Sequence, residues 1–169
     1  MKALILTLIV YVAAVFDTAL ADAMRIGHAA PDMLALTAVV WLLFSAGPRA
    51  LLAAGLIALV GDLVAPGHVG VGAFWMLLVG YAISRLRMLV KLNHLPEQVL
   101  VVWAAVTVWA IAGGLTGRLC ADVPLSSMTV VSRASATGLY TAGVSLPVLM
   151  VLGWFREPRL ASQGKLAEL

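Results

Sequence analysis

Residues 31–87 read PDMLALTAVV WLLFSAGPRA LLAAGLIALV GDLVAPGHVG VGAFWMLLVG YAISRLR, and the arrangement of three helices can be inferred from this segment. It contains two short apolar runs joined at Pro48 and Arg49, then a loop with Pro66, Gly67 and Gly70, and then a longer apolar run. Short apolar runs that flank a tight turn predict two helices folded back on each other, since Pro can open the second helix. The loop rich in Gly and Pro predicts a turn into a third helix.

The composition of the whole chain is that of a membrane protein. Of 169 residues, 63% are hydrophobic and only 11% are charged, whereas a soluble domain is about half apolar. A spanning helix takes about 20 residues, so the chain has room for about six spans. Apolar windows fall at residues 3–22, 32–46, 50–65, 70–90, 97–118 and 132–154. We therefore expect an all-α, polytopic bundle of about six transmembrane helices over residues 1–155, followed by a short polar tail, residues 156–169.

The distribution of basic residues predicts the topology. If the N-terminus is cytoplasmic, the three basic residues on the outer side are Arg25, Arg118 and Arg133, and the other eight lie inside. Cytoplasmic loops carry the excess of Lys and Arg, so both termini are expected in the cytoplasm. The net charge of +3 then reflects insertion into a membrane and not binding to nucleic acid.

The start of the chain has a second interpretation. Lys2, the apolar run behind it and the triplet Ala21-Asp22-Ala23 are similar to a signal peptide with its cleavage site. Asp17 inside the run, and five further apolar windows, favour a helix that is retained.

Asp62 is the most informative polar residue, because it lies in the apolar run IALVGDLV, residues 57–64. A carboxylate at mid-bilayer depth costs roughly 2–4 kcal/mol and needs a partner or a water-filled recess. Its carboxylate could cap N–H groups of the loop that leads to Gly70, form an ion pair with an outer arginine such as Arg25, or bind a solute or ion. Gly61 and Gly67 belong to the same candidate region.

Three more residues are candidates for a structural or partner-binding role. Pro31 and Asp32 open the second helix, where Pro loses no hydrogen bond and an anion meets the positive end of the helix dipole. Arg85 lies with other basic residues where the fourth helix reaches the cytoplasm. Such a collar is explained by topology and anionic headgroups, or by a docking surface for a cytoplasmic protein.

Nothing in the sequence indicates catalysis, a metal site or a cofactor. The single cysteine, Cys120, has no second cysteine to pair with, and His28, His68 and His94 fall in three different connections. There is no HExxH, GxSxG or phosphate-loop motif. We expect a protein that is not an enzyme.

The stretch from Pro31 to Arg87 resembles the rod shape-determining MreD family of bacteria. The similarity lies in the Pro31-Asp32 helix start, the aromatic residue and basic turn between two short helices, the glycine-aspartate helix end, the glycine-rich loop and the Gly80-Tyr81 segment before Arg85. It covers about a third of the chain.

The resemblance implies a non-enzymatic subunit of the machinery that elongates the lateral cell wall, in the bacterial inner membrane. Its partner would be an MreC-like single-span membrane protein, and through it MreB, RodA and a class B penicillin-binding protein. The implied fold is similar to that of the substrate-binding subunits of energy-coupling-factor transporters. That similarity supplies the alternative function, a membrane subunit that binds a vitamin or a metal ion.

Overall fold

The computed structural model describes residues 2–20, 23, 30–45, 47–64, 69–90, 94–121 and 127–154. These residues form six α-helices and one π-helical segment, so the predicted all-α fold is confirmed. The elements are α1 (Lys2–Val15), η1 (Phe16–Leu20), α2 (Met33–Phe44), α3 (Pro48–Val64), α4 (Val71–Leu89), α5 (Leu95–Ala121) and α6 (Ser127–Trp154). The expected tail, residues 156–169, lies outside the described part.

The helices differ in length in the way that the apolar windows predict. Three stretches of the described residues are long and apolar enough to cross a membrane, namely Val71–Leu89, Leu95–Thr116 and Met128–Gly153. Helix α2 has 12 residues and α3 has 17, and Gly47, with a φ of 91°, allows the tight turn between them. The chain is therefore a multi-pass membrane protein with a short helical hairpin inside it.

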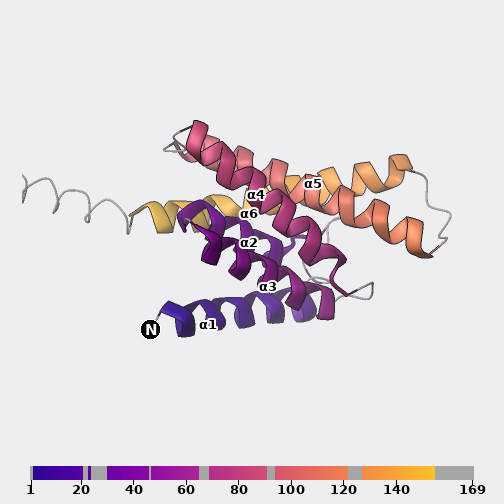
Figure 1. Ribbon diagram of the computed structural model, residues 1–169, viewed down its shortest axis with the longest axis horizontal. Coiled ribbons are helices and arrows are strands. Elements are labelled where there is room, and N and C mark those ends of the chain that lie inside the picture. Colours follow the sequence, from indigo (N-terminus) through magenta and orange to yellow (C-terminus); the bar gives the residue numbers. More distant parts are fainter. Residues whose placement is uncertain are drawn as a thin grey trace, which may run out of the picture.

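Helix α2 lies at the centre of the bundle. It packs against α1, α3, α4, α5 and α6, and seven of its residues are buried, including Ala38 and Val39 with no exposed surface. Helices α5 and α6 form a long antiparallel pair, and α3 packs along α4. Figure 1 shows that α1 begins and α6 ends at the same end of the molecule.

The first helix does not end as a regular α-helix. At Phe16 it changes to a π-helical turn, and the hydroxyl of Thr18 donates hydrogen bonds to the carbonyls of Ala14 and Val15 in the preceding turn. Single π-helical turns often occur at functional sites. Here the turn places Asp17 at the N-terminus of α2.

Candidate functional site

The N-terminus of α2 is held by two carboxylates. Asp17 accepts hydrogen bonds from the amides of Met33 (2.8 Å) and Leu34 (2.9 Å) with its two oxygens. Asp32 is the N-cap residue: its side chain accepts from the amide of Ala35 (2.7 Å), and its carbonyl accepts from Leu36 (3.0 Å). All four amides of the first turn are thus bonded, as the interior of a membrane protein requires.

This helix start is also tied to the last helix. The backbone amide of Asp32 donates a hydrogen bond of 3.1 Å to the hydroxyl of Thr141 in α6, a side chain that is completely buried. Pro31 is buried directly before it. Elements η1, α2 and α6, which are far apart in the sequence, therefore meet at one point.

Asp62 does for α4 what Asp17 does for α2. From the last turn of α3, one oxygen of its carboxylate accepts hydrogen bonds from the amides of Gly70 (2.9 Å) and Ala73 (3.1 Å). Gly70 is the N-cap residue of α4 and has a φ of 96°, which favours glycine. Gly72 is buried against the same carboxylate, and a Cβ atom there would overlap it. The indole N–H of Trp109 in α5 donates to the Gly72 carbonyl at 2.9 Å.

These contacts correspond to the capping alternative for Asp62. Among the described residues, the exposed Arg133 forms no ion pair with it. Arg25 and the side chain of Arg118 lie outside the described part, as does the candidate Gly67. At Gly61 a Cβ atom would stand 3.6 Å from the side chain of Leu34, an ordinary van der Waals distance, so packing against α2 does not require glycine there.

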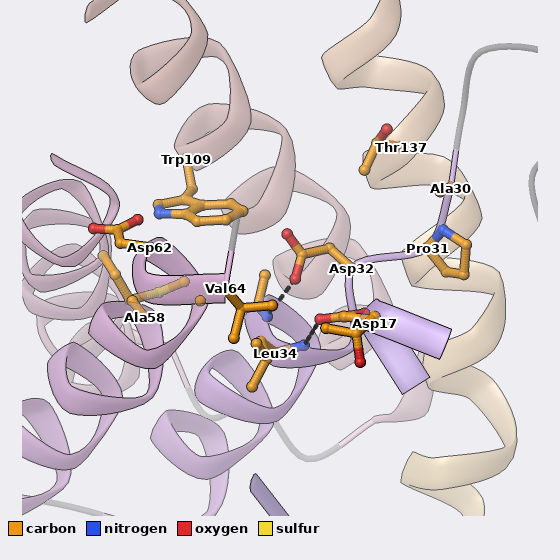
Figure 2. A pocket seen from close by; sticks show the side chains of 14 residues that line it. Asp17, Ala30, Pro31, Asp32, Leu34, Ala58, Asp62, Val64, Trp109 and Thr137 are labelled. Atoms are coloured by element: carbon orange, nitrogen blue, oxygen red, sulfur yellow. Dashed lines mark hydrogen bonds between the residues drawn. The ribbon is translucent and has the colours of Figure 1, made fainter. Parts of the chain in front are cut away.

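The three aspartates line a common cavity of about 480 Å³, together with Trp109, Thr137 and apolar side chains. Figure 2 shows Asp17 and Asp32 beside each other at the start of α2, and Asp62 across the cavity beside the Trp109 indole. Oxygens of all three carboxylates accept backbone N–H groups. The described residues contain no group of three side chains placed to hold a metal ion. Through these bonds Asp17 connects η1 to α2, and Asp62 connects α3 to the start of α4.

At the other end of α2, an arginine side chain binds the backbone carbonyls. Arg87, near the end of α4, donates hydrogen bonds of 2.6 Å to the carbonyls of Leu42 and Ser45, so it caps the C-terminus of α2. Arg85, the sequence candidate, instead bonds to the hydroxyl of Tyr81 on its own helix at 2.9 Å, with its guanidinium 5.2 Å from the centre of that ring. Arg85 is exposed, and no hydrogen bond from it to the backbone of α2 is seen.

Sequence reasoning missed Asp17, Arg87, Thr141 and Trp109 as parts of this network. Asp17 offered a signal, because it is a carboxylate within an apolar run, as Asp62 is. Arg87 offered none, since basic residues at the end of a span are expected from topology alone.

The fold and these polar contacts define a class: a multi-pass helical membrane protein in which Asp and Arg side chains bind the backbone at helix ends. A family model described as rod shape-determining protein MreD matches residues 1–153. The chain therefore belongs to the MreD family, as the resemblance in residues 31–87 predicted. No curated protein and no solved structure matches the chain. The expected similarity to substrate-binding subunits of energy-coupling-factor transporters thus has no support.

Proposed function

We propose that this chain is a non-enzymatic scaffold subunit of the bacterial cell-wall elongation machinery and that it maintains rod shape by binding an MreC-like single-span protein. The observation that carries the proposal is the family match over residues 1–153, because the family is one of shape-determining proteins. MreB, RodA and a class B penicillin-binding protein would be reached through that partner. The chain would lie in the inner membrane with both termini in the cytoplasm.

The chemistry of the bundle supports a scaffold. Asp17, Asp32 and Asp62 are used to bind backbone amides, and Arg87 to bind backbone carbonyls. A scaffold needs such ties because lipid supplies little drive for helices to associate, so packing and polar contacts must set their positions. Side chains already committed in this way are poor general acids or bases.

The test is recovery of the partner from the native membrane. The tagged chain is extracted in mild detergent and, in parallel, in nanodiscs, and the proteins and small molecules that accompany it are identified by mass spectrometry. A multi-pass protein of similar size with the same tag is the control. We expect the MreC-like protein with the chain and not with the control. A folded chain that recovers no MreC-like protein in either medium would contradict the proposal, and recovery of a vitamin with an ATPase module would favour the transporter function.

A further inference from the structure

Helix α6 contains a proline in its last third. Pro147 has no N–H to donate to the carbonyl of Gly143, one turn earlier, so the helix lacks one of its backbone hydrogen bonds there. In the same turn the hydroxyl of Ser145 donates a hydrogen bond of 2.6 Å to the carbonyl of Ala142, and side-chain bonds to the preceding turn often bend helices. A Cβ atom at Gly143 would have no neighbour within 4 Å. Residues 143–147 thus combine the features of a helix hinge.

The part of α6 before this hinge is held by two neighbouring helices. Thr141 is completely buried, and its hydroxyl accepts a hydrogen bond of 3.1 Å from the backbone amide of Asp32 at the start of α2. Gly138 lies so close to Thr107 of α5 that a Cβ atom at position 138 would overlap the threonine hydroxyl. Helices α2 and α5 therefore fix the position of this part of α6.

The part after the hinge, residues 147–154, is called the arm here, and far fewer contacts hold it. Among residues 148–153 only Leu149 is buried, with 1% of its surface exposed. Its neighbours Met150 and Val151 are 60% and 53% exposed. Figure 1 shows these last turns of α6, drawn in yellow, at one end of the bundle. The arm is thus joined to the core by a single side chain.

The arm also separates two apolar grooves. One groove, of about 780 Å³, lies between α6, α1 and α2, and Val148 and Val151 of the arm form part of its wall. The other, of about 510 Å³, lies between α6 and α5, and its wall includes Met150 of the arm and Leu146 just before it. Because the two grooves share the arm as a wall, a movement that narrows one of them widens the other.

We propose that the arm is a conformational switch, which pivots at residues 143–147 between a position nearer α5 and a position nearer α1 and so exchanges volume between the two grooves. A group that fills one groove then shifts the arm toward the other groove, because it favours one of the two positions. The hinge thereby couples two surfaces on different sides of α6. This inference does not depend on the proposed function.

Distances between two spin labels, measured by double electron–electron resonance in nanodiscs, test the movement. Cys120, the single cysteine of the chain, is first replaced by Ser. One label is attached after Tyr11→Cys in α1, at a position that is 66% exposed and lines neither groove. The second label is attached after Gly153→Cys on the arm, where a Cβ atom has no neighbour within 4 Å. In the control it is attached after Ala136→Cys, at an exposed position in the fixed part of α6.

We expect a broad or two-peaked distance distribution for the labels at positions 11 and 153, and a single narrow peak for positions 11 and 136. Pro147→Ala restores the missing N–H and should narrow the first distribution without changing the second. Gly143→Ala stiffens the backbone at the same place and should also narrow it, which keeps the test open if the proline variant does not fold. Two equally narrow distributions with Pro147 in place overturn the proposal. A broad first distribution that neither substitution narrows also overturns it, since fraying of the helix end needs no hinge.

A further substitution tests the coupling between the grooves. Val99→Phe adds volume to the groove between α5 and α6, because Val99 is part of its wall. Val108→Phe is the matched control, since Val108 also lies in α5, is 53% exposed and lines neither groove. We expect Val99→Phe to shift the distances between positions 11 and 153 to shorter values and Val108→Phe to leave them unchanged. An unchanged distribution with Val99→Phe, or a shift to longer distances, would show that the arm does not exchange volume between the grooves and overturn the switch.

Discussion

Gly72 lies so close to Asp62 that any side chain at position 72 would enter the space of the carboxylate. The same carboxylate binds the amides of Gly70 and Ala73. One acidic residue at the end of α3 thus restricts position 72, in the first turn of α4, to glycine. Asp17 repeats the arrangement between η1 and α2.

Replacement of Gly72 by Ala should destabilise the bundle. The new methyl group meets Asp62 and forces the carboxylate off the amides, and overpacking of this kind costs about 1–3 kcal/mol. Gly143→Ala is the matched control, because nothing lies within 4 Å of its Cβ position and Ala favours a helix over Gly. Thermal unfolding in detergent, followed by circular dichroism, should show a lower midpoint for the first variant and an equal or higher one for the second.

Asp62 itself should tolerate Asn better than Ala. The side-chain carbonyl of Asn can accept an N–H bond at the start of α4, whereas Ala leaves the amides of Gly70 and Ala73 without that acceptor. Loss of such a cap costs about 0.5–2 kcal/mol. The midpoint of thermal unfolding should fall in the order Asp, Asn, Ala. If Ala at this position is as stable as Asp, the cap contributes nothing.

Asp17→Ala should loosen the start of α2. The amides of Met33 and Leu34 lose their acceptors, and no water is at hand in lipid to replace them. Hydrogen–deuterium exchange should rise at these two amides. Thr18→Ala is the control, because its hydroxyl bonds within its own segment to Ala14 and Val15. Unchanged protection of the two amides in the Asp17 variant would contradict the contact.

Arg87 and Arg85 should differ although they are two residues apart. Arg87→Ala removes two charged hydrogen bonds to the C-terminus of α2 and should cost about 1.5–3 kcal/mol. Arg85→Ala removes an exposed contact with Tyr81 and should change stability by at most about 0.5 kcal/mol. The unfolding midpoints of the two variants, measured under identical conditions, decide the point, and equal losses would refute the assignment.

The helices were predictable because the length of an apolar run is a local property of the sequence. Even so, α5 and α6 extend beyond their windows. In α6 the added residues include the polar Ser127 and Thr129, which continue a helix without adding to its hydropathy. Capping by Asp62 was among the alternatives that its neighbours suggested, because its acceptor role involves residues only 8 and 11 positions away.

The remaining contacts join residues that no spacing rule connects. Arg87 bonds to Ser45 across 42 positions and Asp32 to Thr141 across 109. Such pairs depend on how the helices pack around α2, which periodicity does not specify. Arg85 was a candidate from the sequence and Arg87 was not. Charge alone does not show which of two basic residues at a helix end is exposed and which packs against another helix.

The shortness of α2 has a consequence for the membrane around it. Twelve residues at 1.5 Å each make a rod of about 18 Å, while the hydrocarbon layer is about 30 Å thick. At least one end of α2 must therefore lie inside the hydrocarbon layer, where water cannot reach peptide groups. Asp17, Asp32 and Arg87 form the hydrogen bonds with the ends of α2 that water would otherwise form. Either the bilayer beside α2 becomes thinner, or neighbouring helices occupy the part of the hydrocarbon layer that α2 does not span.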